Sequence, residues 1–133
     1  MNKIEHLGIA VKDLKMASSL YQKLLGAPSY KTENVASEQV LTQFFKIGDS
    51  KIELLAATHQ DSAIANFIEK KGEGLHHIAF LVDDIYQEMA RLKSEGFILL
   101  SDEPKIGADH KLICFVHPKS SSGVLIELCQ EIK

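Results

Sequence analysis

The stretch GLHHIAFLVDD, residues 74–84, places two adjacent histidines at the start of an apolar run. The run is rich in branched residues, which is typical of a strand, and Asp84 after it is suited to cap a helix. Neighbouring side chains of a strand point to opposite faces, so only one of His76 and His77 can face the interior. The stretch therefore predicts a strand with one buried imidazole, followed by a helix.

An earlier segment repeats this pattern and selects between the two histidines. IEHLGIAV (4–11) aligns with LHHIAFLV (75–82) without a gap, so that His6 corresponds to His77 and Asp13 to Asp84. Apolar residues at helical spacing follow each aspartate and stop at Gly26 in the first case and before Gly96 in the second. The repeat indicates that His77, rather than His76, is the inward-facing histidine.

The ends of the two halves also match. GDSKIELLA (48–56) and SGVLIELCQ (122–130) share a glycine and the core Ile-Glu-Leu, which makes Glu53 the counterpart of Glu127. Further strands are expected near 38–47 and 51–56, and near 97–100, 111–117 and 123–129. We predict an α+β fold of two paired βαβββ modules, about 1–58 and 75–133, joined by a linker helix at about 59–74 within a single domain, 1–133.

Because side chains alternate along a strand, each repeated segment has a face of larger apolar residues and an opposite face that carries a histidine or a glutamate. If the modules pack with pseudo-twofold symmetry, their open faces form a curved sheet, or cup, on which four side chains converge: His6, Glu53, His77 and Glu127. Two imidazoles and two carboxylates suit a divalent transition ion such as Zn, Co, Ni, Mn or Fe. The other histidines are expected to be solvated or hydrogen bonded: His59, His76, His110 and His117.

Composition excludes several classes of partner. The chain has 45% hydrophobic residues, 15 Lys and Arg against 18 Asp and Glu, and no basic cluster, so nothing marks a surface for nucleic acid or an anionic membrane. No apolar stretch approaches the roughly 20 residues of a membrane span. We expect a soluble, cytoplasmic protein in which Cys114 and Cys129 are reduced core thiols.

Together with DEPKIGADHK (102–111) and HPKSSSGVLIEL (117–128), these motifs resemble the vicinal oxygen chelate superfamily and, within it, the methylmalonyl-CoA epimerases. The resemblance implies a homodimer that binds a divalent metal ion through His6, His77 and Glu127, with Glu53 at a fourth position. It further implies an isomerase that acts on a small-molecule acyl-CoA, interconverting the 2R and 2S forms of methylmalonyl-CoA.

Epimerisation requires removal of the proton between a thioester and a carboxylate and its return to the other face. Glu127 and Glu53 are the candidates for the two acid–base groups, since two carboxylates related by pseudo-symmetry would flank a substrate lying on the axis. Three alternatives stay open: a glyoxalase I-like lactoylglutathione lyase, an iron dioxygenase, and a non-catalytic ligand-binding or drug-sequestering member of the superfamily.

Overall fold

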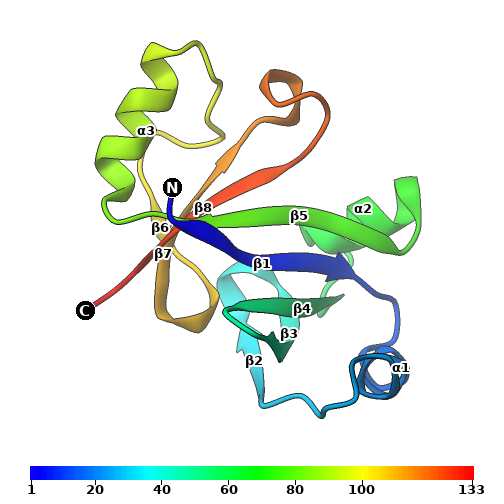
Figure 1. Cartoon of the computed structure of the whole chain (residues 1–133). Coiled ribbons are helices and arrows are strands. Elements are labelled where there is room, and N and C mark those ends of the chain that lie inside the picture. The colour runs from blue at the N-terminus through cyan, green and yellow to red at the C-terminus, as the bar shows by residue number, and fades with distance from the viewer. The chain divides into compact units, whose positions relative to one another are not determined.

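The computed structural model describes residues 1–133 and has a mixed α+β fold in which the element order βαβββ occurs twice (Figure 1). The first copy comprises β1 (Lys3–Ala10), α1 (Leu14–Leu25), β2 (Lys31–Val35), β3 (Val40–Ile47) and β4 (Ser50–Ala57). After α2 (Ala63–Lys71), the second comprises β5 (Gly74–Leu81), α3 (Ile85–Ser94), β6 (Lys105–Ile106), β7 (Lys111–Val116) and β8 (Ile126–Glu131). The α+β class and the repeated element order expected from the sequence are confirmed.

The helix ends follow the local signals in the sequence. The Asp13 side chain accepts a hydrogen bond from the backbone N–H of Met16, and Asp84 does the same for Gln87, so both aspartates cap their helices. Helix α1 ends at Gly26, whose φ of 74° is the left-handed conformation that glycine adopts without strain. None of the helices has the length and apolar character needed to cross a lipid bilayer.

Three details of the strand prediction were wrong, one of them the two-residue strand β6, which lies where no strand was expected. Strand β2 was missed because its sequence, KTENV, is polar and lies at the end of the strand order, where alternate residues are exposed. The strand expected at 97–100 is replaced by one isolated bridge between Leu99 and Val116. Phe97 and Leu99 pack against buried side chains, so their alternation reflects an extended segment lying on the core rather than a ladder of hydrogen bonds.

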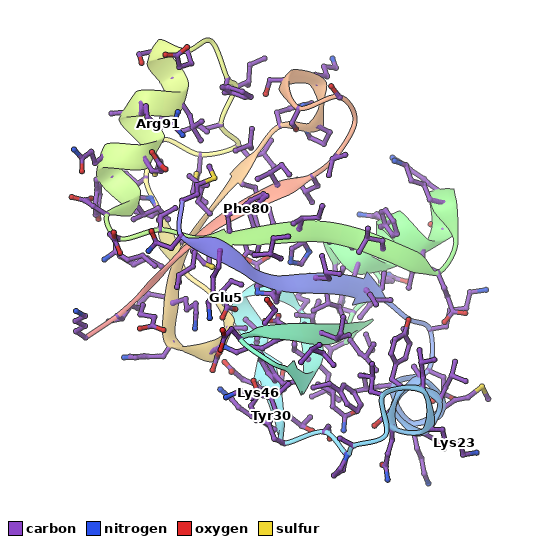
Figure 2. All side chains as sticks on the ribbon, viewed as in Figure 1. Glu5, Lys23, Tyr30, Lys46, Phe80 and Arg91 are labelled. Atoms are coloured by element: carbon purple, nitrogen blue, oxygen red, sulfur yellow. The ribbon has the colours of Figure 1, made fainter.

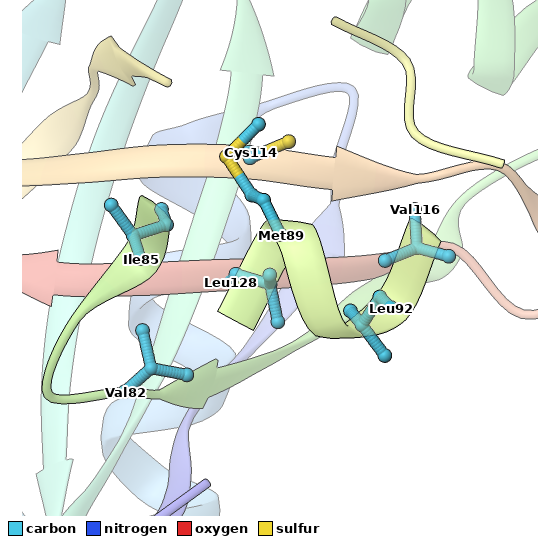
Figure 3. Close-up of a cluster of buried hydrophobic side chains, with 7 residues drawn as sticks. All are labelled: Val82, Ile85, Met89, Leu92, Cys114, Val116 and Leu128. Carbon is cyan, nitrogen blue, oxygen red and sulfur yellow. The ribbon is translucent and has the colours of Figure 1, made fainter. Parts of the chain in front are cut away.

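Contacts divide the chain into two compact units, of which the first contains residues 1–6 and 77–133. In this unit β5 pairs in parallel with β8, and β7 pairs antiparallel with both β8 and β6. Helix α3 packs on β7 and β8 through a cluster of buried side chains (Figure 3): Val82, Ile85, Met89, Leu92, Cys114, Val116 and Leu128. Both cysteines are buried and form no disulfide, as expected.

The second unit, residues 7–76, contains the remainder of β1 with β2, β3 and β4. Helix α1 covers one face of its strands through a cluster of buried residues: Val11, Ala17, Phe45, Leu54 and Ala56. The antiparallel register of β3 and β4 pairs Phe44 with Glu53 and Thr42 with Leu55. Because side chains alternate along a strand, these four residues lie on the face opposite α1.

Candidate metal centre

Three strands of the first unit bring two imidazoles and one carboxylate together. His6 on β1, His77 on β5 and Glu127 on β8 are 4%, 5% and 6% exposed, and their ligand atoms all lie within 4.8 Å of one another. The Nε2 atoms of the two histidines are 3.0 Å apart, and Oε1 of Glu127 is 3.2 Å from Nε2 of His77 and 3.8 Å from Nε2 of His6.

The strand register explains why these side chains meet. Ala79 on β5 lies directly opposite Glu127 on β8, and His77 is two residues before Ala79, so all three side chains share one face. Ala79 is fully buried and adds only a methyl group to that face. Phe115 on β7 is the other cross-strand neighbour of Glu127, and its ring lies edge-on to the ring of His77, 5.7 Å away. The Glu127 carboxylate thus has Phe115 as its cross-strand neighbour and the imidazoles of His6 and His77 beside it.

The adjacent histidine has a different environment. The ring of His76 packs edge-on against Phe67 of α2, with the ring centroids 4.9 Å apart. His59 and His117 accept backbone hydrogen bonds within their own loops, from Asp61 and Lys119. His59 and His117 are therefore hydrogen bonded, as expected from the sequence, whereas His76 packs against an aromatic ring.

The surroundings of Glu127 favour its ionised form. Burial by itself raises the pKa of this carboxyl, but the hydrogen bond from His77 and the electrostatic influence of the His6 and His77 imidazoles outweigh burial and hold the pKa below its usual value. A buried carboxylate of this kind is ready to bind a cation or to accept a proton.

Glu5 is a residue of this site that the sequence reasoning missed. It is 3% exposed on β1, where Figure 2 labels it, and its Oε1 lies 2.9 Å from Nδ1 of His6. An ionised carboxylate can only accept, so Nδ1 of His6 donates to Glu5 and the lone pair lies on Nε2, which faces Nε2 of His77 at 3.0 Å. Neighbouring side chains of a strand start on opposite faces, so the sequence alone offered no reason to expect a contact between Glu5 and His6. The glutamate side chain is long enough to make that contact all the same.

The geometry of the cluster fits a metal ion. Nitrogen and oxygen ligands lie about 2.0–2.2 Å from Zn²⁺ in a tetrahedral site, which separates them from one another by roughly 3.3–3.6 Å. The observed separations of 3.0, 3.2 and 3.8 Å are close to this range. The orientation of His6 by Glu5 is the arrangement by which carboxylates commonly fix a metal-binding histidine.

The fourth predicted residue, Glu53, belongs to the second unit. It lies on β4, is 3% exposed, and shares with Phe44 the face opposite α1.

Comparison with known proteins identifies relatives over nearly the whole chain. Residues 5–115 match the model of the glyoxalase/bleomycin resistance protein/dioxygenase superfamily. The chain is 40% identical to the ethylmalonyl-CoA/methylmalonyl-CoA epimerase of Cereibacter sphaeroides, with 98% of each chain covered. It is also 40% identical to the mitochondrial methylmalonyl-CoA epimerase of Homo sapiens, covering 98% of this chain and 74% of that protein.

Solved structures extend the similarity to three dimensions. A variant of Streptomyces coelicolor methylmalonyl-CoA epimerase, in complex with 2-nitronate-propionyl-CoA, is 36% identical and superposes with a TM-score of 0.95. The match covers 98% of this chain and 95% of that chain. The fold of this protein is therefore the fold of a known epimerase.

Proposed function

Because the chain belongs to the glyoxalase/bleomycin resistance protein/dioxygenase superfamily, we propose that it is a metal-dependent isomerase that interconverts the 2R and 2S forms of methylmalonyl-CoA. The observation that carries this proposal is the buried cluster of His6, His77 and Glu127, whose ligand atoms converge within 4.8 Å. This arrangement supplies a cation site in a part of the chain that shares its fold with the epimerases.

The reaction needs stabilisation of negative charge and a base. The proton to be removed lies between a thioester and a carboxylate, and the neighbouring negative charge of the carboxylate opposes its loss. When bound, a divalent ion such as Co²⁺, Zn²⁺, Ni²⁺ or Mn²⁺ supplies Lewis acidity that offsets the charge developing on the substrate oxygens. His6 and His77 would be the neutral ligands of such an ion, and Glu5 would keep His6 in the tautomer that can bind it.

Proton transfer is assigned to two carboxylates. Glu127 accepts the proton from one face of the substrate carbon, leaving the electron pair as an enolate, and protonated Glu53 delivers a proton to the opposite face. The reverse direction exchanges the two roles, and solvent restores both protonation states. Glu127 can serve as ligand and base because one of its oxygens can bind while the other accepts the proton.

The first experiment is the exchange of solvent deuterium into methylmalonyl-CoA, followed by NMR. We expect exchange at the carbon between the two carbonyl groups together with inversion, loss of both after treatment with a chelator, and recovery with added Co²⁺. Persistent turnover in metal-free protein would remove the metal from the proposal. An absence of exchange with every divalent ion tested would exclude the epimerase and redirect the assay to the hemithioacetal substrate of a lactoylglutathione lyase.

Glu53 is proposed as both the fourth metal ligand and the second acid–base group, on the basis of its correspondence to Glu127 in the repeat. Glu53→Gln should stop inversion while one enantiomer still exchanges its proton with solvent, because Glu127 can remove a proton and return a deuteron to the same face. The control is Glu69→Gln on α2, which makes the same change at an exposed position. Full epimerisation by Glu53→Gln would contradict the assignment.

The homodimer and the cytoplasmic location expected from the sequence stay predictions. The mass of the protein in solution, measured by light scattering, tests the first of them. Localisation of the tagged protein in its host tests the second.

A further inference from the structure

Thr42, in the middle of β3, carries a buried hydroxyl without a partner. The residue is completely buried, and its Oγ1 forms no hydrogen bond in the structure. Burying a hydroxyl without a hydrogen bond destabilises the folded state. Valine has the same shape and would occupy the position without this penalty, so packing alone gives no reason for the threonine.

The strand register places this hydroxyl beside Glu53. Thr42 lies opposite Leu55 on β4, and Phe44, two residues along β3, lies opposite Glu53. Thr42 and Glu53 are therefore diagonal neighbours on one face, at a Cα separation of roughly 7–8 Å. Both lie on the face opposite α1, whereas Phe45 and Leu54 lie on the face that α1 covers.

The surrounding polar side chains do not satisfy the hydroxyl. Glu33 lies directly across from Thr42 on β2, but its carboxylate is 3.3 Å from the ammonium group of Lys31. Gln43, the next residue along β3, points to the other face and donates to Ser29. On the Thr42 face the neighbour along the strand is Phe44, whose ring contacts the ring of Tyr30, labelled in Figure 2.

We propose that the Thr42 hydroxyl donates a hydrogen bond to a negatively charged oxygen of the bound acyl group, on the same face as Glu53. The inference rests on the proposed function and assigns a substrate-binding residue to it. A hydroxyl is suited to this position because it donates to an anionic oxygen without placing a second titratable group next to a carboxylate. On this proposal, the Thr42 hydroxyl has no hydrogen-bond partner in the free protein because its partner is the substrate.

Three variants test the inference by stability and binding together. Thr42→Val removes the hydroxyl at nearly constant volume, and Thr42→Ser keeps it. Thr32→Val makes the same chemical change on β2 at an exposed position whose register partner is Gln43 on the other face, and is the matched control. The probe is 2-nitronate-propionyl-CoA, because its nitronate carries negative charge on the two oxygens of a nitrogen attached to the reacting carbon.

We expect Thr42→Val to raise the Tm by about 3–8 °C, because it removes an unpaired buried polar group. The same variant should bind the nitronate about 10- to 100-fold more weakly and lose a similar factor in the exchange rate, because a hydrogen bond to a charged group is lost. Thr42→Ser should keep the affinity within about threefold, and Thr32→Val should change neither quantity.

Two results would overturn the inference while the epimerase assignment stands. One is a Thr42→Val protein with wild-type affinity for the nitronate, whatever its Tm. The other is a Thr42→Ser protein that remains folded but loses affinity as strongly as Thr42→Val, since serine retains the hydroxyl. A wild-type protein that neither binds the nitronate nor exchanges deuterium would overturn the proposed function and this inference with it.

Discussion

Glu127→Gln should lower the rate of epimerisation by about 10³-fold or more. The substitution keeps the shape of the side chain but removes the group that accepts the proton, and it weakens one ligand of the proposed metal ion. Glu127 is buried against His6 and His77, and its ionised form is favoured there, so glutamine loses both the charge and the basicity of this position. The measurement is the rate of deuterium exchange for each enantiomer separately.

The control for this variant is Glu131→Gln, which makes the same change at the exposed end of β8. It should exchange deuterium at the wild-type rate. The metal content of both variants is measured on the same samples, so that loss of the ion can be separated from loss of the base. A Glu127→Gln protein that retains its metal and epimerises normally would contradict the role of Glu127 in proton transfer.

His77→Ala should lower the affinity for Co²⁺ by at least about 100-fold and abolish epimerisation in metal-limited assays. The imidazole it removes has its Nε2 3.0 Å from Nε2 of His6 and 3.2 Å from Oε1 of Glu127. Its loss leaves only two of the three converging groups to bind the ion. Binding is measured by titration of the apo-protein with Co²⁺, whose absorption spectrum reports the ligands directly.

His76→Ala is the matched control, because it makes the same change one residue earlier on the same strand. The ring of His76 packs on Phe67, so its loss should reduce the free energy of unfolding by about 1 kcal/mol and leave Co²⁺ affinity unchanged. If the two variants bound Co²⁺ equally well, His77 would not be a ligand.

Much of the fold was accessible from short-range patterns. Apolar runs predicted β1, β5 and β8, the capping aspartates Asp13 and Asp84 predicted the helix starts, and the repeat assigned His77 to the inside of its strand. These features depend on side-chain alternation and on capping within one turn, which neighbouring residues determine. Strand β2 was not predicted, because a polar strand at the end of the strand order has no apolar pattern to recognise.

The amino-acid order thus determined the α+β class, the doubled βαβββ order and the candidates His6, His77 and Glu127. Only the tertiary structure decided which atoms meet: that Ala79 faces Glu127, that Glu5 holds Nδ1 of His6, and that the hydroxyl of Thr42 is buried without a partner. Each of these depends on the register of a pairing or on the reach of a long side chain. Register is set by the packing of residues far apart in the sequence, so no local pattern contains it.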